Sequence, residues 1–522
     1  MKKLIAILLT LCMAVALGSA AFADGDMMEK KTEADTIYVG VYGYTLANCD
    51  PISSRNTAVI SQVYDSLFYV DHSGEKAEIK PLLAESYEYE ENDNGGWTLH
   101  LHLRENATFA SGTPITANDV LESARSIVDS GNSTYVASIN WDESYIEGDY
   151  DVYFVLNNYD PILLQAMCHL FFGVVNQEWK AGASEEDWWD NIDESGPFTV
   201  EEMVNGSHAK LKVRDDYWGW GVISDRPSYD YMVIKYYSEA STMIVDFENG
   251  ALDYVSNVQR NDVERILSDG LEHSTLDLIE TGAVIDLILP EYVEQLQDIN
   301  VRKAIASVMD VAGITNAVWG SLATPCDGYI SNMNSDYKIV FGVNEPDLEA
   351  AKDYMAQSAY PEGFDLHMVI KNVEADQNFA TILKAELAEI GIGLDLEEAE
   401  MSVAIGKFRA GETDLMMNQF SSMAYPSNIY NNRMSDTTLI PCLISDEGVQ
   451  ENLVIGRTTP DFDTAYEAYE AVQNFQHDNT TEVPICEILC GVLYRDYVDA
   501  SRSGSYLLSG VYDFRFLDLK TE

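Results

Sequence analysis

Two histidines in this sequence have the spacing of a pair of metal ligands. His100 and His102 fall within the alternating segment WTLHLHL at 97–103, which predicts a half-buried β-strand. Residues two apart in a strand point to the same face, so both imidazoles could reach one divalent cation such as zinc. The sequence offers no third ligand nearby. We therefore favour two solvent-facing histidines and expect no metal site.

The cysteines are a second set of residues with chemistry of their own. Beyond the N-terminal segment they are Cys49, Cys168, Cys326, Cys442, Cys486 and Cys490. Their spacing is irregular, except that Cys486 and Cys490 lie four apart in an apolar, strand-like stretch. Two buried thiols or one local disulfide suit that stretch better than a metal ion does, and the pairing stays open.

Motifs of enzymatic catalysis are missing from the sequence. It has no His-Glu-x-x-His, no Gly-x-Ser-x-Gly, and no glycine-rich phosphate loop followed by Lys-Ser or Lys-Thr. The 87 acidic residues bring some carboxylates together by chance, so they do not define an acid–base pair. We expect a protein with no catalytic residues and no cofactor, and a secreted hydrolase is the alternative from another class.

The charge balance limits the possible partners. The 522 residues include 87 Asp and Glu against 31 Lys and Arg, which gives a formal net charge of -56 spread along the chain. Such a surface repels nucleic acid and anionic lipid, so we expect no nucleic-acid partner. A 46% hydrophobic content is enough for a large core, and the length suggests two to four domains.

The N-terminus has the order of a secretory signal peptide. Lys2 and Lys3 precede an apolar run at 4–17, and small residues follow up to Ala23. The run is shorter than the ~20 residues that span a bilayer. We predict a signal peptide at 1–23 and a flexible leader at 24–35, with an uncleaved anchor as the alternative. Cys12 has no small residue before it and does not read as a lipid acceptor, so we expect export to the periplasm or the outer face of the cytoplasmic membrane.

Hydrophobic patterns alternate between strand and helix along the chain. We predict strands at 36–42, 97–103, 363–370 and 391–396, and helices at 57–68, 241–249, 300–310, 348–357 and 380–389. Thr116 and Asp119 predict a capping box at the start of a further helix. The strand–helix–strand order in the second half predicts parallel strand pairs in an α/β fold.

Several motifs in order resemble the family 5 extracellular solute-binding proteins, the dipeptide-, oligopeptide- and nickel-binding group. The most specific block comprises PLLAESY at 81–87, WTL at 97–99, LREN at 103–106, Phe109 and GTPITANDV at 112–120. Later matches are SGPF at 195–198, RDDYW at 214–218, NGALD at 249–253, VRKA at 301–304 with Asp310, YPEGF at 360–364 and EIGI at 389–392. Asn106 stands where the family usually has glycine. The ordered set runs from about residue 36 to the C-terminus.

This resemblance implies an α/β, periplasmic-binding-protein-like fold (type II, cluster C), a two-lobed clamshell with an extra subdomain. Lobe I would comprise 36–275, with the subdomain at 63–195, and lobe II would comprise 276–484. Residues 485–522 would return to lobe I. The family also implies a monomeric binding component of an ABC importer, which closes on a small molecule or peptide and docks on a membrane permease. A chaperone-like or sensory receptor without a transport role is a further alternative.

The resemblance also suggests where a ligand would bind. Peptide-binding members carry a lobe II loop whose Asp pairs with the α-amino group of the peptide. The matching segment here, 418–428, has no carboxylate, and its candidate contacts are Phe420, Ser421, Ser422 and Tyr425. A buried ammonium would be unpaired there, which is costly. We expect a peptide held mainly by its backbone or another small polar solute, with an oligosaccharide or a metal chelate as alternatives.

Four more candidate contacts follow from position in the family fold. Tyr44 and Thr45 follow the first strand, where the family loop faces the cleft, and we expect the 36–62 and 418–428 segments to face each other. Lys371 and Asn372 follow a lobe II strand, where Lys371 could bind an anionic group as a point charge. The alternatives are ordinary loop residues and a solvated lysine.

Overall fold

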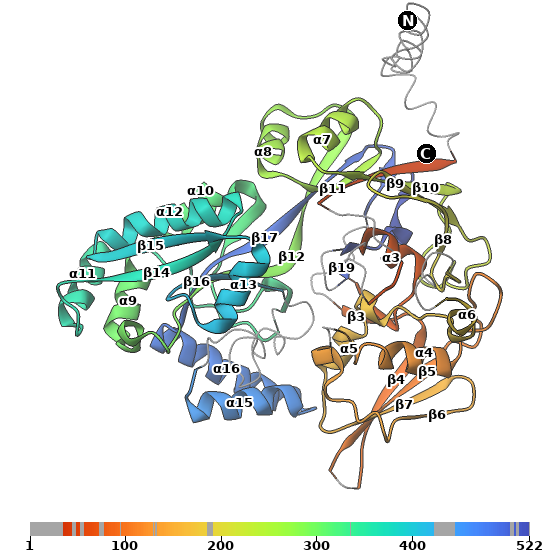
Figure 1. Ribbon diagram of the computed structural model, residues 1–522, viewed down its shortest axis with the longest axis horizontal. Coiled ribbons are helices and arrows are strands. Elements are labelled where there is room, and N and C mark those ends of the chain that lie inside the picture. Colours follow the sequence, from red (N-terminus) through yellow and green to blue (C-terminus); the bar gives the residue numbers. More distant parts are fainter. Residues whose placement is uncertain are drawn as a thin grey trace, which may run out of the picture.

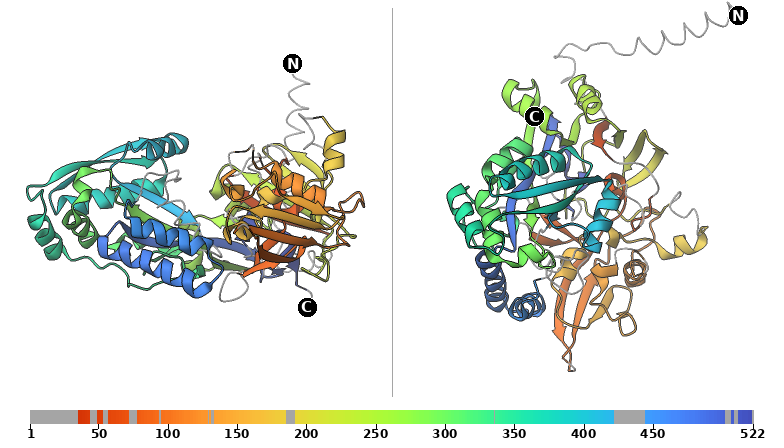
Figure 2. Two further views of the ribbon diagram at one scale, coloured as in Figure 1. Left: turned by 90° about the horizontal axis from the view of Figure 1, so that it is seen from below. Right: turned by 60° about the vertical axis from the view of Figure 1, so that its left-hand side comes forward.

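The chain forms two lobes joined by a pair of long strands (Figures 1 and 2). The computed structural model describes residues 35–43, 49–52, 57–71, 78–93, 95–128, 130, 133–184, 192–334, 336–421, 444–501, 506–507 and 511–520. Within these residues, no helix combines the length and the hydrophobicity needed to cross a membrane.

One nine-stranded sheet extends through both lobes in the order β16-β12-β17-β11-β1-β10-β9-β8, with β13 paired to β17. Its strands are β1 (Thr36–Tyr42), β8 (Phe198–Val204), β9 (His208–Val213), β10 (Tyr231–Tyr237), β11 (Tyr254–Val258), β12 (Ser274–Ile288), β13 (Ala323–Pro325), β16 (Met416–Ser421) and β17 (Glu482–Arg495). β1 has the bounds that its alternating sequence predicts. β1 runs parallel to β10 and β11, whereas β17 runs antiparallel to β11 and β12.

The two longest strands, β12 and β17, pass from one lobe into the other. Their antiparallel pairing runs from Ser274 opposite Arg495 to Ile288 opposite Glu482, with a register shift between Glu280 and Ala283. One end of each strand contributes to the core of the first lobe, and the other end contributes to the core of the second lobe. We call residues 278–284 of β12 and 487–491 of β17 the crossing segment. The lobe boundaries predicted at 275/276 and 484/485 fall inside these strands.

The first lobe carries a smaller sheet in the order β4-β5-β7-β6, beside the β2–β3 hairpin. Its elements are β2 (Phe68–Asp71), β3 (Glu78–Pro81), β4 (Ala84–Glu91), β5 (Trp97–Leu103), β6 (Tyr145–Glu147), β7 (Asp151–Leu156), α3 (Thr57–Val63), α4 (Ala117–Arg125), α5 (Ile162–Ala166) and α6 (Gln177–Gly182). The predicted strand at 97–103 is confirmed as β5. The capping box is confirmed too, because the Thr116 N–H donates to Asp119 Oδ2 at 3.0 Å and Asp119 is the N3 residue of α4.

The helix predicted at 57–68 is too long, because α3 ends at Val63. The N–H groups of Leu67 and Phe68 instead donate to the carbonyl of Met167, at 3.3 and 3.4 Å, and Phe68 starts β2. A backbone partner from a distant segment therefore ends a helix that the local apolar pattern would continue.

Two helices, α7 (Ala240–Glu248) and α8 (Arg260–Asp269), cover the opposite face of the large sheet, with Met243, Phe247, Val263 and Ile266 in a core of their own. The short strands β18 (Val498–Asp499), β19 (Tyr506–Leu507), β20 (Val511–Tyr512) and β21 (Asp518–Leu519) bring the C-terminal tail back to the first lobe. The main core of the first lobe and the smaller core under α7 and α8 therefore pack on opposite faces of the large sheet.

The second lobe is built from helices around the other ends of β12 and β17 and around a parallel strand pair. Its elements are α9 (Ile299–Val308), α10 (Val311–Val318), α11 (Leu348–Gln357), α12 (Glu374–Ala388), α13 (Met401–Ala410), α15 (Glu447–Thr458), α16 (Phe462–Asn479), β14 (Phe364–Lys371) and β15 (Ile392–Ala399). β14 and β15 pair in parallel from Phe364 opposite Ile392 to Lys371 opposite Ala399, which confirms the predicted strand–helix–strand unit. The apolar face predicted for the helix near 300–310 is buried in α9 at Val301, Ala304, Ile305 and Val308.

Candidate ligand-binding site

The strands that precede both predicted ligand-binding segments end at the crossing segment. β16 ends with Ser421 opposite Ala283, which in turn pairs with Ile488 of β17. On the other side of β17, β11 ends with Val258 opposite Gly491, and β1 runs parallel to β11. Ile488 and Gly491 are three residues apart, about 10 Å along a strand. Across the sheet, β12, β17 and β11 lie between β1 and β16, which adds about 19 Å. The segments that follow β1 and β16 thus leave the sheet about 20 Å apart, on either side of the crossing segment and one from each lobe.

Four of the eight predicted contact residues lie outside the described residues. These are Tyr44, Thr45, Ser422 and Tyr425. For Phe420 and Ser421 the structure describes the backbone alone, which pairs with Val284 and Ala283 of β12. Their contact with a ligand remains a prediction that rests on the position of the strand ends.

Lys371 lies at the end of β14, where a carboxylate already accompanies it. Its Nζ is 3.5 Å from Asp376 Oδ2, and its backbone N–H donates to the same oxygen at 3.2 Å. Burial raises the pKa of Asp376, and the charge of Lys371 opposes that rise. Asn372 accepts a hydrogen bond from Gln377 Nε2 at 3.1 Å. An anionic ligand group at Lys371 would therefore compete with Asp376, which comes from the first turn of α12.

Asn257, at the end of β11, has a backbone conformation that is uncommon for a residue with a side chain. Its φ is 57°, in the left-handed region, and its Oδ1 accepts a hydrogen bond from Cys490 Sγ of β17 at 3.1 Å. Such conformations are held by their surroundings and cluster at binding and switch sites. Cys486 and Cys490 are both buried and are not bonded to each other, so no local disulfide joins this pair.

A buried ionic cluster joins β17 to the second lobe beside the crossing segment. Lys338 Nζ lies 3.0 Å from Glu487 Oε1 and 2.6 Å from Asp327 Oδ1, and its side chain is 4% exposed. Glu487 also accepts hydrogen bonds from Ser331 Oγ and from the Asn332 N–H, at 3.0 and 3.1 Å. Burial disfavours the charge of Lys338, but the bond to Asp327 and the charge of Glu487 outweigh it and raise the pKa of Lys338.

Away from the crossing segment, a cavity of about 210 Å³ has walls from both lobes. Tyr159 and Pro161 line it from the first lobe, and Pro460 and Phe462 are among the residues that line it from the second. The lobes therefore come close at two places, the crossing segment and this cavity, and the predicted ligand segments start at the first of them.

Residues 78–438 match the model of the bacterial extracellular solute-binding proteins, family 5. This match extends over more than half of the chain. The chain belongs to this family. Heme-binding protein A of Haemophilus influenzae is 22% identical over 416 residues, covering 72% of this chain and 73% of that protein.

Solved structures share the fold of this family 5 protein. One is the periplasmic binding protein DppA of Helicobacter pylori in complex with the peptide STSA, with a TM-score of 0.76 and 18% identity over 94% of this chain and 100% of that one. Another is NikZ of Campylobacter jejuni in complex with Ni(L-His), with a TM-score of 0.72 and 17% identity over 93% and 99%. At such low identity these similarities establish the two-lobed fold alone.

The histidine pair of this family 5 protein has a partner that the sequence did not reveal. His100 Nε2 and His102 Nδ1 lie 2.7 and 2.9 Å from the same oxygen, Oδ1 of Asp151 on β7. Burial opposes ionisation of Asp151, but the hydrogen bonds from His102 and His100 outweigh it and lower the pKa of Asp151. The described residues hold no group of three or more His, Cys, Asp or Glu arranged to bind a metal ion. The pair therefore forms a hydrogen-bonded surface cluster.

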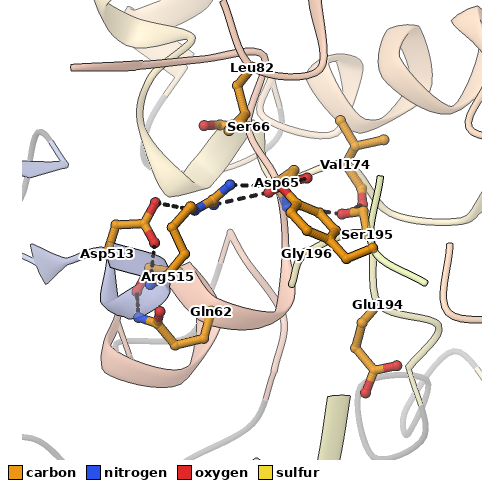
Figure 3. A network of polar contacts seen from close by, with 12 residues as sticks. Gln62, Asp65, Ser66, Leu82, Val174, Glu194, Ser195, Gly196, Asp513 and Arg515 are labelled. Carbon is orange, nitrogen blue, oxygen red and sulfur yellow. Dashed lines mark hydrogen bonds and ion pairs between the residues drawn. The ribbon is translucent and has the colours of Figure 1, made fainter. Parts of the chain in front are cut away.

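A second buried network anchors the C-terminal tail to the first lobe (Figure 3). The Arg515 guanidinium, 2% exposed, lies 3.0 Å from Asp65 Oδ1 and 2.6 Å from Asp513 Oδ2, and it donates to Tyr217 Oη at 2.8 Å. The Phe514 N–H donates to Gln62 Oε1 of α3 at 2.9 Å. Because these groups are buried and mutually bonded, the network has a structural role.

Proposed function

We propose that this protein is the extracytoplasmic binding component of an ABC importer, which holds a peptide-like or other small polar solute between its lobes and delivers it to a membrane permease. One observation carries the proposal. A single sheet runs through both lobes, and the strands before the two predicted ligand segments end on either side of its crossing segment, about 20 Å apart. A solute bound there would touch both lobes in the closed form and would stabilise that form.

The ligand we favour has no free ammonium group at the 418–428 segment. That segment contains no Asp or Glu, so a buried ammonium there would lack a countercharge. Its hydroxyl, amide and aromatic groups suit a neutral polar solute or a peptide bound through its backbone. The related DppA was solved with the peptide STSA, which supports a peptide-like class.

A metal chelate is the second candidate ligand. NikZ, which shares the fold, was solved with Ni(L-His), so this architecture accommodates a chelate in another protein. The predicted contacts here offer few groups that would bind a nickel ion directly, which makes the peptide-like class the stronger candidate. The missing nucleophile and metal motifs give no support to a hydrolase.

The setting we propose is outside the cytoplasm. The charged, apolar and small-residue order of residues 1–23 supports export, and the net charge of -56 argues against nucleic acid as a partner. We expect the mature chain to act as a monomer that meets its permease at the membrane.

A binding assay on the mature chain from residue 24 onward tests this proposal. The probes are the peptide STSA, the same peptide with its N-terminus acetylated, Ni(L-His) and maltotriose, each examined by thermal shift and calorimetry. A ligand at 100 times its Kd stabilises the fold by about 2.7 kcal/mol. We expect the acetylated peptide to bind at least as tightly as the free one. Binding of the free peptide alone would contradict the ligand class, and hydrolysis of a peptide would contradict the binding function.

A further inference from the structure

Two turns face each other between the lobes, away from the crossing segment. Residues 159–161 lie in the connection from β7 to α5 in the first lobe, and residues 459–461 connect α15 to α16 in the second. Both line the same cavity of about 210 Å³. Figure 1 shows α5 facing one end of α15 below the strands β11, β12 and β17. The two lobes thus approach each other at a point displaced from the strands that join them.

The turn of the first lobe is held rigidly by its own lobe. Tyr89 Oη donates to the carbonyl of Asp160 at 2.7 Å, and the Ile162 N–H donates to Asp160 Oδ1 at 3.0 Å. The Tyr159 ring lies 4.8 Å from the Tyr89 ring and 5.1 Å from the Trp97 ring, measured between centroids. This side of the cavity is therefore a preformed surface.

The turn of the second lobe is held in a similar way. Asp461 caps α16, because its Oδ1 accepts hydrogen bonds from the Thr464 N–H and Oγ1, at 2.9 and 2.6 Å. The Tyr337 ring lies 5.2 Å from the Phe462 ring and 5.5 Å from the Tyr469 ring. Two preformed surfaces therefore meet at the cavity.

The facing surfaces carry both polar and apolar groups, and their apolar part is incompletely covered. Phe462 is 50% exposed although it lines a cavity that the opposite lobe also lines. Burial raises the pKa of Asp160, and the positive charge of Arg457 in the opposite lobe acts in the other direction. Apolar surface and an attraction of opposite charges across the gap both favour closer approach.

We propose that Tyr159, Pro161, Pro460 and Phe462 form a rim contact that holds the lobes together in the closed form without touching the ligand. The rim contact is displaced from the crossing segment, so a small rotation about that segment separates its surfaces. The rim contact therefore stabilises the closed form alone. By raising the fraction of molecules that are closed, it increases the apparent affinity for the ligand. This inference extends the proposed function, because closure matters for a receptor that traps a solute.

Cross-linking in the absence of ligand tests the rim contact. The mature chain carries Pro161→Cys and Pro460→Cys in a Cys442→Ser background, and dibromobimane links the two new thiols. The described native cysteines Cys49, Cys168, Cys326, Cys486 and Cys490 are buried, and each single-cysteine variant serves as a control for stray reaction. We expect the double variant to become cross-linked between the lobes, at a rate proportional to the population in which the surfaces meet.

A matched pair of substitutions then separates the rim contact from general effects on the fold. Phe462→Ser removes the apolar ring that faces the opposite lobe, whereas Val454→Ser removes an equally exposed apolar side chain, also 50%, that does not line the cavity. We expect Phe462→Ser to slow cross-linking about fivefold and Val454→Ser to leave it unchanged. Equal rates in the two variants, or no cross-link in the double variant, would overturn the rim contact. The assay needs no ligand, so failure to bind any probe bears on the proposed function alone.

Discussion

The ammonium of Lys338 lies 3.0 Å from the carboxylate of Glu487, in one of the two long strands that pass between the lobes. This ion pair ties a loop of the second lobe to the crossing segment. Because both side chains are less than a tenth exposed, each relies on the other to remain ionised inside the protein.

Loss of Lys338 should therefore destabilise the protein strongly. Lys338→Met leaves the buried Glu487 without its cation, and we expect the free energy of unfolding to fall by about 3 kcal/mol. Urea denaturation followed by tryptophan fluorescence measures this change. Lys352→Met, at an exposed position of α11, is the control and should stay within about 0.5 kcal/mol of wild type. A similar small effect for Lys338→Met would show that Glu487 finds another partner.

Arg515 should stabilise the first lobe strongly, although it lies near the C-terminus. Arg515→Met leaves Asp65 and Asp513 buried without their cation, which we expect to cost about 3–5 kcal/mol. Calorimetry of the mature chain should show a lower melting temperature for the first lobe. Arg409→Met, at an exposed position of α13, should melt like wild type. An unchanged melting curve for Arg515→Met would mean that the tail is not anchored by this network.

Glu386 should make stability fall as the pH rises. Burial raises the pKa of Glu386 to about 7, the hydrogen bond from the Asp310 N–H acts against that rise, and the charge of Asp310 adds to it. The folded state therefore keeps a proton that the unfolded state releases near pH 4.5. The contribution of Glu386 to stability is highest below that pH and decreases up to pH 7, by about 3 kcal/mol at most.

Urea midpoints between pH 4 and 8 check this prediction. In Glu386→Gln the side chain stays neutral, so the decrease from this group should disappear. Glu389→Gln, one turn later and exposed, should keep the wild-type pH profile. The interpretation fails if the urea midpoints of both variants depend on pH in the same way.

Substitution by alanine should change the stability of the protein in opposite directions at two glycines of the second lobe. Gly363 has φ +84°, and a Cβ there would lie 2.1 Å from the carbonyl oxygen of Gly391. Gly363→Ala should therefore destabilise the β14–β15 pair by about 2 kcal/mol or more. Gly406 in α13 has open space around it, and Gly406→Ala should stabilise by about 0.5–1 kcal/mol. Thermal denaturation of both variants measures the direction of each change in stability. Wild-type stability of Gly363→Ala would show that the turns at Gly363 and Gly391 can move apart.

The elements that the sequence predicts well are those with a strong local pattern. β1 and β5 have the predicted bounds, the capping box of Thr116 and Asp119 is present, and the buried face of α9 is the predicted one. In each case the deciding interaction lies within a few residues of sequence, in the alternation, the cap or the helical period.

Elsewhere the deciding partner is far away in sequence. α3 stops at Val63 because the backbone of Leu67 and Phe68 bonds to Met167, and the acceptor for His100 and His102 is Asp151, some 50 residues later. The counterion of Lys338 in β17 is 149 residues away. No local pattern encodes such pairs, because they depend on which strands the fold places side by side.

By itself the sequence determined the family, the alternation of strands and helices, and the missing carboxylate at 418–428. These follow from short-range patterns and from motifs in a fixed order. The tertiary structure decided that β12 and β17 pass through both lobes, and that β1 and β16 end on either side of the crossing segment. It also decided that Tyr159 and Pro161 line one cavity together with residues 459–461. Each of these depends on long-range strand pairing and lobe packing, whose energy comes from contacts between residues that are distant in the chain.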